Sequence, residues 1–522
     1  MANKNILLIE PGYRNKYPPL GLMKVAQYHG ADGKRDRVVF VKGEDPKVLF
    51  EPWDRIYVTT LFSFEFTRIS RSLDYALTAA NGLADRVFAG GIAVSLMPEQ
   101  FENESRWHGI RFIRGLLSSS PAAALQLDPV AGELYADDTD STPIENLIPD
   151  YSILEQIPYK YPVNDAYFTY ASRGCIRKCS FCGVPKLEGA QRDTDSLSAV
   201  ISGIEKRYGP KKDLLLMDNN VVASSRFKEI VAEIRDLGFG AGAVISRGNR
   251  VQKRRVDFNQ GVDARILCKD PMYLRELSTL CLSPLRIAFD HLGVRGPYEK
   301  AVRYAHDFGM NDLSNYMLYN FHDSPTDLFE RMRLNVTLNE ELGIRIWSFP
   351  MRFQPTNLPS RSYIGEHWTR YELRSMQIIL QATHGVVSGD PEFFKGAFGD
   401  TASDFRELLF RPQHFIFNRT WYERGPGVED LRAYQDAAGR CTSEERNEVI
   451  RLLSTTTPAH YSAAIKGIPD RNIARLANFY LPLTREVETA IWRRRTENLI
   501  GCTLGDDEKV EDAGLDALED AV

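Results

Sequence analysis

The sequence predicts an α/β protein whose last third is mostly helical, and two patterns carry this prediction. Over residues 1–355, short aliphatic runs alternate with amphipathic stretches of helical period, which is typical of parallel sheets covered by helices. From about Asn357 onward, apolar residues recur every three or four positions, as they do in helices. The chain has 522 residues, 43% of them hydrophobic and 26% charged, so it is long enough for two to four domains with sizeable cores.

Residues 1–150 are expected to form a Rossmann-like domain. The predicted strands cover residues 6–9, 38–41, 55–60 and 86–89, and the predicted helices cover residues 18–29 and 66–80. The fourth strand runs into Gly90-Gly91, and ligands of such sheets bind at the carboxyl ends of the strands. Residues 98–150 show only weak periodicity.

Residues 151–355 contain six strand–helix units, which suggest a partial (β/α)6 barrel. The predicted strands cover residues 166–172, 213–217, 256–267, 285–290, 315–320 and 345–349. As in complete barrels, the chemistry is expected at the carboxyl ends of these strands.

The remainder of the chain is predicted to be a helical domain followed by a tail. The domain covers residues 356–505, with helices expected over residues 369–383 and 442–455. Residues 506–522 are acidic and poor in large apolar side chains, so we expect them to be disordered.

The composition of the chain limits the binding partners and the cellular compartment that we expect. A net charge of -5 gives no overall attraction to nucleic acid or to anionic membranes. No window approaches the roughly 18 apolar residues of a membrane helix, and the N-terminal apolar run is too short for a signal peptide. The 7 cysteines do not form a disulfide framework, so a reducing, cytoplasmic location is expected.

The most informative motif is a C-x3-C-x2-C loop formed by Cys175, Cys179 and Cys182. Three thiolates on one short loop can hold three irons of a [4Fe-4S] cluster, which normally has four cysteine ligands. The next cysteine along the chain is Cys268. One iron is therefore left open, and an open metal position is where a substrate or cofactor can bind. The alternative is a zinc site completed by a distant Cys or His.

This loop resembles the signature of radical S-adenosylmethionine (SAM) enzymes. The resemblance implies that Cys175, Cys179 and Cys182 are the metal ligands and the catalytic groups, and that SAM binds the open iron. It further implies reductive cleavage of SAM to a 5'-deoxyadenosyl radical, which abstracts hydrogen from a substrate that the sequence does not identify. An electron donor of the flavodoxin or ferredoxin type is implied as partner. Phe181, just before the third cysteine, would lie beside the adenine.

The resemblance places further SAM contacts after the second and fifth predicted strands. Asp218, Asn219 and Asn220 follow the second strand, where the family often has Gly-Gly-Glu, and they supply acceptors for the SAM amino group. The alternative is a simple turn, for which Asp-Asn-Asn is a suitable sequence. Asn320 ends the fifth strand, whose following loop backs the adenine in the family.

The third predicted strand carries four more candidates. Asn259, Gln260, Asp263 and Arg265 resemble a segment that lies near the ribose and carboxylate of SAM. Arg265 suits a carboxylate because its planar guanidinium binds two oxygens at once. The alternative for Asp263 and Arg265 is an internal ion pair.

The first domain also resembles the cobalamin-binding domain that precedes many radical SAM barrels. The resemblance rests on the helix start at residues 18–22 and on the turn at Gly90-Gly91. It adds cobalamin as a further cofactor and cobalamin-dependent methyl transfer as an alternative function. The Asp-x-His-x-x-Gly motif of many such domains is absent, so a vestigial domain is the other interpretation. Methylthiotransferases carry cluster cysteines in this domain, whereas no cysteine precedes Cys175 here.

A basic run provides an alternative of another class. It consists of Arg247, Arg250, Lys253, Arg254 and Arg255, which could contact the phosphates of a nucleic acid. A solvated loop is the simpler interpretation, because no stacking aromatic residues lie within the run. A non-catalytic scaffold that keeps a cluster is disfavoured by the intact three-cysteine loop.

Overall fold

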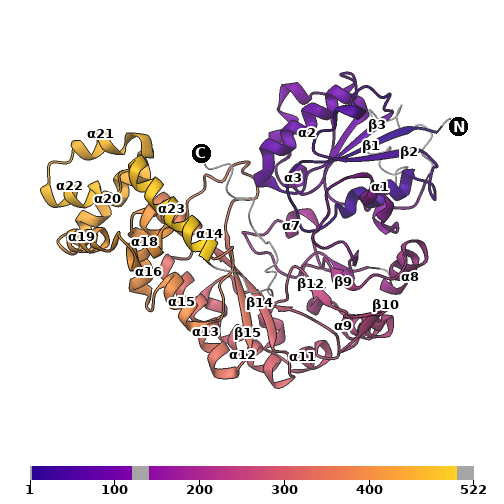
Figure 1. Cartoon of the computed structure of the whole chain (residues 1–522). Coiled ribbons are helices and arrows are strands. Elements are labelled where there is room, and N and C mark those ends of the chain that lie inside the picture. Colours follow the sequence, from indigo (N-terminus) through magenta and orange to yellow (C-terminus); the bar gives the residue numbers. More distant parts are fainter. Residues whose placement is uncertain (1–2, 120–139, 195, 502–522) are drawn as a thin grey trace. The chain divides into compact units, whose positions relative to one another are not determined.

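The structure is a computed structural model that describes residues 3–119, 140–194 and 196–501. The chain falls into two compact units (Figure 1). The first takes the described residues up to Ala288, together with Gly296–Ser314 and Phe353–Tyr363. The second takes Phe289–Arg295, Asn315–Arg352 and the described residues from Ile364 onward. The predicted acidic tail, residues 506–522, lies outside the described residues.

The first unit begins with a five-stranded parallel sheet in the order β2-β1-β3-β4-β5. The strands are β1 (Asn5–Glu10), β2 (Arg37–Lys42), β3 (Arg55–Thr59), β4 (Val87–Gly90) and β5 (Arg111–Ile113). The accompanying helices are α1 (Leu20–His29), α2 (Phe66–Ala79), α3 (Ile92–Leu96) and α4 (Pro98–Glu102). The four predicted strands and both predicted helices are confirmed. β5 was not predicted, because three residues are too few to show a period.

The sheet is held by side chains that its sequence dictates. β1 is almost continuously apolar because strands of a covered parallel sheet are buried on both faces. Leu7 lies between Val39 of β2 and Ile56 of β3. The helix α2 packs Ile69 and Leu73, one turn apart, into the same core.

Six further strands follow in the middle of the chain. Three form a parallel sheet in the order β12-β9-β6, and three form a sheet in the order β13-β14-β15. Their bounds are β6 (Ala166–Thr169), β9 (Asp213–Leu216), β12 (Val256–Phe258), β13 (Leu285–Arg286), β14 (Asp312–Tyr319) and β15 (Arg345–Arg352). Parallel bridges pair Val256 with Leu282 and Val262 with Ile287, next to β13.

All six strands predicted for this region are present, but the fourth, predicted over residues 285–290, is reduced to the two residues of β13, and the third is also shorter than expected. The prediction covered residues 256–267, whereas β12 ends at Phe258. A turn at Gly261, which has a φ of 82°, interrupts it, and the Asp263 side chain then caps the short helix α10 (Ala264–Leu267). The helices of the region are α8 (Leu197–Tyr208), α9 (Phe227–Ile234), α11 (Met272–Leu277), α12 (Arg295–Asp307) and α13 (Pro325–Leu342).

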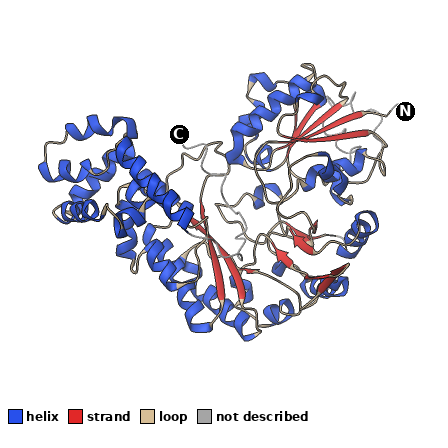
Figure 2. Ribbon diagram, viewed as in Figure 1, coloured by secondary structure: helices blue, strands red, loops and turns tan. Residues whose placement is uncertain are grey.

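The last third is mostly helical in its described part, as Figure 2 shows. Capping boxes at Thr369 and Thr442 begin α14 and α20, so both predicted helices are confirmed. The helices are α14 (Arg370–Ala382), α15 (Pro391–Phe398), α16 (Ala402–Phe410), α17 (Gln413–Phe417), α18 (Arg419–Arg424), α19 (Val428–Gly439), α20 (Ser443–Thr455), α21 (Tyr461–Lys466), α22 (Arg471–Asn478) and α23 (Arg485–Gly501). Within the described ranges, no helix is both long and apolar enough to cross a membrane.

Candidate functional site

The cysteine loop begins directly after β6 and the two-residue strand β7 (Ser172–Arg173). Its backbone geometry requires glycine at Gly174, which has a φ of 76° and where a Cβ would lie 2.2 Å from the Ala190 carbonyl oxygen. Gly183 ends the loop, and a Cβ there would lie 2.8 Å from the side chain of Leu96 in α3. The loop is therefore closely packed on both sides.

The sulfurs of Cys175 and Cys182 accept backbone hydrogen bonds within this loop. The backbone N–H of Arg177 donates to Cys175 Sγ at 3.3 Å, and that of Val184 donates to Cys182 Sγ at 3.4 Å. All three cysteines are half-buried and reduced. Hydrogen bonds to sulfur are a normal feature of thiolates that bind iron–sulfur clusters, so this donor arrangement fits such a group.

A site for a single metal ion would require a different arrangement of ligands. In the described part of the chain, no three Cys, His, Asp or Glu side chains are grouped so as to hold one metal ion. In a four-iron cluster each thiolate binds a different iron, so the three cysteine ligands do not have to converge on one point.

Asp218 lies at the end of β9 and fixes the start of the loop. Its buried carboxylate accepts the backbone N–H of Ala171 at 2.9 Å, and both the backbone N–H and the hydroxyl of Ser172. Burial raises the pKa of Asp218 to about 6. Both oxygens are thus engaged by the segment before the cysteines, and the predicted contact of Asp218 with SAM stays a prediction.

Asn219 is held by an acid that the sequence analysis did not identify. Glu188 Oε2 accepts the Asn219 side-chain amide at 2.8 Å and the Gly174 backbone N–H at 2.7 Å. One carboxylate therefore ties the loop after β9 to the first residue of the cysteine loop. The only local signal for Glu188 was its position six residues after Cys182.

Asp263 joins the cysteine loop to the segment after β12. Its carboxylate accepts Arg177 Nε at 2.7 Å and Arg265 Nε at 2.8 Å. Burial opposes ionisation, but the hydrogen bonds from Arg265 and Arg177 lower the pKa of Asp263. Its hydrogen bond to Arg265, with a smaller contribution from Cys179, raises the pKa of that guanidinium. The internal ion pair considered for Asp263 and Arg265 is confirmed, and Arg177 is a third member.

The other candidates of this region lie close by. Asn220 is buried, and its Oδ1 accepts the backbone N–H of Asp263 at 3.4 Å. Asn259 is buried, and its Oδ1 accepts the hydroxyl of Tyr17 at 2.6 Å. Gln260 is exposed, and Phe181 is half-buried within the cysteine loop. Tyr17 comes from the loop after β1 and was not identified from the sequence.

Asn320 belongs to the second unit and ends β14. It is buried with a φ of 67°, and its Oδ1 accepts the backbone N–H of Gly365 at 2.7 Å. Its predicted contact with adenine is not tested by these interactions.

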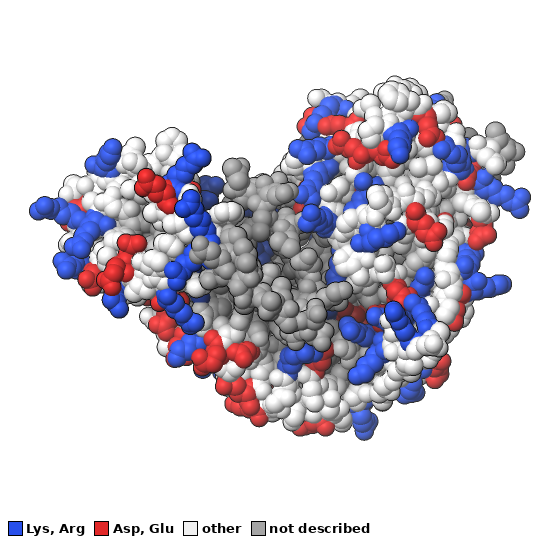
Figure 3. Space-filling model, viewed as in Figure 1, with Lys and Arg blue, Asp and Glu red and all other residues white. Residues whose placement is uncertain are grey.

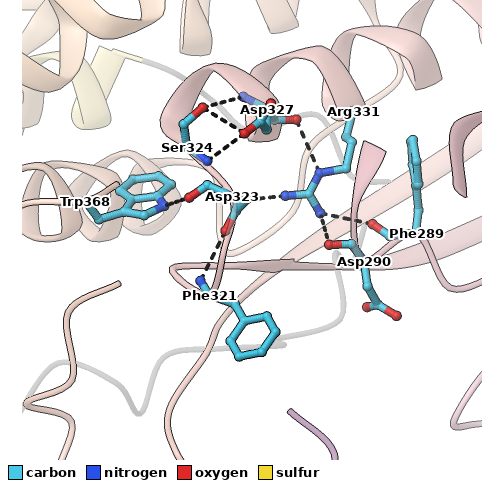
Figure 4. A network of polar contacts seen from close by, with 8 residues as sticks. All are labelled: Phe289, Asp290, Phe321, Asp323, Ser324, Asp327, Arg331 and Trp368. Carbon is cyan, nitrogen blue, oxygen red and sulfur yellow. Dashed lines mark hydrogen bonds and ion pairs between the residues drawn. The ribbon is translucent and has the colours of Figure 1, made fainter. Parts of the chain in front are cut away.

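The loop after Asn320 is anchored by a buried ion pair (Figure 4). Arg331 of α13 donates to Asp323 Oδ2 at 2.8 Å, and also to the carbonyls of Phe289 at 3.0 Å and Asp290 at 2.9 Å. Trp368 Nε1 donates to the Asp323 carbonyl at 2.9 Å. Burial raises the pKa of Asp323 and lowers that of Arg331, and the attraction between the two groups opposes both shifts.

The five-stranded sheet has a reversal of strand order between β1 and β3, the usual position of a ligand in such sheets. On the β1 side the edge is filled. The buried Glu10 pairs with Lys42 at 3.0 Å and accepts the Tyr161 hydroxyl, and the Lys42 ammonium lies 4.7 Å from the Tyr159 ring centre. Burial raises the pKa of Glu10.

The other side of the same edge is formed by close backbone contacts. Gly91 has a φ of 124°, and a Cβ there would lie 2.8 Å from the Thr60 carbonyl oxygen. Phe64, which follows β3, is 40% exposed. This side, after β3 and β4, thus carries the close Gly91–Thr60 approach and the partly exposed ring of Phe64.

The basic run forms a hairpin of β10 (Val244–Arg247) and β11 (Arg250–Lys253) and the residues after it. Arg247 pairs with Asp165 at 2.6 Å, and the guanidinium of Arg254 lies 3.7 Å from the Phe239 ring centre. Acidic and basic side chains are interspersed among the described residues on the face drawn in Figure 3. Arg247 and Arg254 are thus engaged within the protein, and the run expected as a solvated loop is largely an exposed β-hairpin.

The known proteins found to be similar to this chain are all solved structures. No family model and no curated protein matches the chain. A structure of the radical SAM methyltransferase TsrM from Kitasatospora setae, with cobalamin and a [4Fe-4S] cluster bound, is 14% identical, covering 68% of this chain and 74% of TsrM at a TM-score of 0.45. A second TsrM structure, with tryptophan substrate and a SAM analogue, is 15% identical, covering 78% and 89% at a TM-score of 0.47.

A structure of Streptococcus suis SuiB bound to S-adenosylmethionine is also similar. It is 11% identical and covers 42% of this chain and 47% of SuiB, with a TM-score of 0.28. Since all three TM-scores are below 0.5, the function proposed below rests on the residues of this chain.

Proposed function

We propose that this protein is a radical SAM enzyme. Bound at Cys175, Cys179 and Cys182, a [4Fe-4S] cluster would supply an open iron for SAM and the electron that cleaves it to a hydrogen-abstracting 5'-deoxyadenosyl radical. The observation that carries the proposal is the cysteine loop at the carboxyl end of β6, whose sulfurs accept backbone N–H groups. The reacting hydrogen and the substrate are left open, because one fold supports many reactions.

The residues around the loop have separate tasks in this proposal. Asp218 and Glu188 fix the backbone on which the cysteines stand. The Asp263 carboxylate accepts hydrogen bonds from the Nε atoms of Arg177 and Arg265 and so fixes both side chains. The terminal nitrogens of Arg265 are therefore the ones that would meet the SAM carboxylate. Such positioning lowers the barrier by fixing reactants in place before the chemistry begins.

We assign the remaining SAM contacts to the candidates around these residues. Asn219 and Asn220 would face the amino group, and Asn259 and Gln260 the ribose. Phe181 would lie near the adenine, and the adenine contact of Asn320 stays a prediction from the sequence. The amides of Asn259 and Asn219 have fixed partners, which suits this role because their orientation is set before the ligand arrives.

The proposed architecture follows from the strand order. Residues 1–150 form a Rossmann-like, cobalamin-binding-like domain, residues 151–355 a partial (β/α)6 barrel and residues 356–505 a helical domain. The support is the parallel five-stranded sheet and the six later strands in chain order. A cluster on half-exposed thiolates needs a reducing compartment, so we place the enzyme in the cytoplasm with a flavodoxin- or ferredoxin-type reductant.

Cobalamin-dependent methyl transfer is the second candidate, and the reversed strand order at β1 and β3 favours it. The Glu10–Lys42 network fills one side of that edge, so cobalamin would lie on the other side, over Gly90 and Gly91 at the end of β4. Cobalamin absorbance in the reconstituted protein, with S-adenosylhomocysteine formed beside 5'-deoxyadenosine, would support it. Reconstituted protein lacking both signals would exclude it.

The test of the main proposal is made anaerobically on reconstituted protein. SAM and dithionite are added, and 5'-deoxyadenosine is quantified for the parent, for a variant with Cys175, Cys179 and Cys182 changed to Ala, and for Cys268→Ala. Release by the parent and Cys268→Ala, but not by the triple variant, is the expected result. Bound zinc without iron in the parent would refute the proposal.

A further inference from the structure

A cavity of about 460 Å³ lies among the last helices of the second unit. Its walls come from α14, α17, α21 and α23, which are labelled in Figure 1 except for α17, and from residues 480–483. This volume is within the range of small-molecule sites, which are mostly apolar with a few placed polar groups. The radical chemistry proposed above does not use this cavity.

The floor of the cavity is aromatic. Tyr371, Tyr461 and Tyr480 line it and are buried. Their hydroxyls donate to backbone carbonyls after α16, in α20 and at the end of α16, at 2.8, 3.3 and 2.7 Å. Because these hydroxyls are already bonded, the three tyrosines offer the cavity ring surface rather than polar groups.

The rim of the cavity adds two exposed aromatic side chains. Phe417 is 45% exposed and Trp492 is 66% exposed, and both line the cavity. Large aromatic side chains at a surface cavity are typical of binding sites, because exposed apolar surface is costly in water. Together with the floor, they form a pocket suited to a flat ring.

Besides the tyrosines, the polar side chains that line the cavity are Arg374, Gln413, His414, Asn418 and Glu488. Gln413 Nε2 is buried, and no described residue accepts a hydrogen bond from it. Arg374 contributes an exposed guanidinium, whose fork matches the two oxygens of a carboxylate. His414 is not a second cation, since burial lowers its pKa to about 4. Glu488 lies on α23, one turn before Trp492.

We infer that this cavity binds a small aromatic carboxylate. The ring would pack between the tyrosine floor and Trp492, and the carboxylate would bridge Arg374 and the amide of Gln413. A free aromatic acid and the C-terminal aromatic residue of a peptide share this chemistry. Glu488 adds a partner for a neighbouring ammonium group, as in a free amino acid.

The inference is tested by calorimetric titration of the full chain with 3-phenylpropionate, beside the uncharged 3-phenylpropionamide. We expect saturable binding of the acid with a Kd below about 1 mM, and roughly tenfold weaker binding of the amide. Arg374→Gln should weaken binding of the acid roughly tenfold and leave the amide unchanged. Arg370→Gln on the same helix, outside the cavity, should behave like the parent.

Further titrations distinguish between the possible sources of the ligand. Tighter binding of an acetylated peptide that ends in Phe would identify a peptide terminus, and tighter binding of phenylalanine would identify a free amino acid; either supports the site. Trp492→Ala should weaken the binding of every aromatic ligand. A chain ending at Gly501 tests whether residues 502–522 compete for the cavity. Equal affinity for acid and amide, no effect of Arg374→Gln, or no binding to either chain length would overturn the inference.

Discussion

The buried ion pair of the second unit allows a sharp test of how the loop after β14 is held. The change Arg331→Leu leaves the Asp323 carboxylate buried without its cation. It also removes a donor from the carbonyls of Phe289 and Asp290, which accept from the same guanidinium. Removing one partner of a buried pair costs about 3–5 kcal/mol, so we expect a loss of this size in the free energy of unfolding.

A matched control is available on the surface of the same unit. Arg432 pairs with Glu429 at 2.6 Å, but their side chains are 68% and 79% exposed. Such pairs are worth about 0.2–1 kcal/mol, so Arg432→Leu should change stability little. For a domain of roughly 150–250 residues, each kcal/mol shifts Tm by about 2–4 °C. Scanning calorimetry should therefore show a shift of roughly 6–20 °C for Arg331→Leu in the transition of the second unit.

Equal shifts for the two variants would refute this reasoning. The double variant Arg331→Leu, Asp323→Leu separates charge from packing, because replacing a whole buried pair with apolar residues is often nearly neutral. Recovery of much of the lost Tm is expected. A double variant as unstable as the single one would show that lost packing, rather than the unpaired carboxylate, causes the effect.

Three further changes test the first unit. Asp263→Asn removes the charge shared by two guanidinium groups. Amide hydrogen exchange in the cysteine loop should therefore accelerate, and the iron content after reconstitution should fall. The control Asp270→Asn, at an exposed position, should change neither quantity. Asp218 has a pKa raised to about 6, so the stability it contributes is present below about pH 4 and is lost as the pH rises through 6. Urea unfolding of apoprotein should show the parent losing roughly 3 kcal/mol relative to Asp218→Asn over that window, and a constant difference would contradict the assignment. Gly174→Ala places a Cβ at a positive φ and 2.2 Å from the Ala190 carbonyl oxygen, so it should abolish iron loading. Gly209→Ala has a similar φ but open space around the Cβ, so it should load iron like the parent. Equal loading of the two variants would count against a steric role for Gly174.

Much of the framework could be predicted because its causes are local. Continuous aliphatic runs such as β1 and amphipathic stretches such as α8 identify their own structure within a few residues. The cysteine spacing is local too, which is why the loop could be placed after a strand. By contrast, β12 is shorter than predicted because Gly261 and Asp263 redirect a chain whose composition is still that of a strand.

The contacts that complete the site join distant parts of the sequence. Tyr17 and Asn259 are 242 positions apart, and no periodicity links them. Glu188 acts on Gly174 and Asn219 at once, a role that only the folded backbone defines. Asp263 and Arg265 were close enough in sequence for the ion pair to be considered, but Arg177 was 86 positions away.

The packing of the cysteine loop against α3 determines how this protein can be divided. Leu96 presses on Gly183 and Tyr17 bonds to Asn259, while Tyr161 and Glu10 share a buried hydrogen bond. A fragment that starts at residue 151 would open all three contacts and expose the buried tyrosine and the glycine backbone to water. The first 150 residues are thus a structural part of the site, and a shortened gene product would lose the residues that support the cysteine loop along with the sheet.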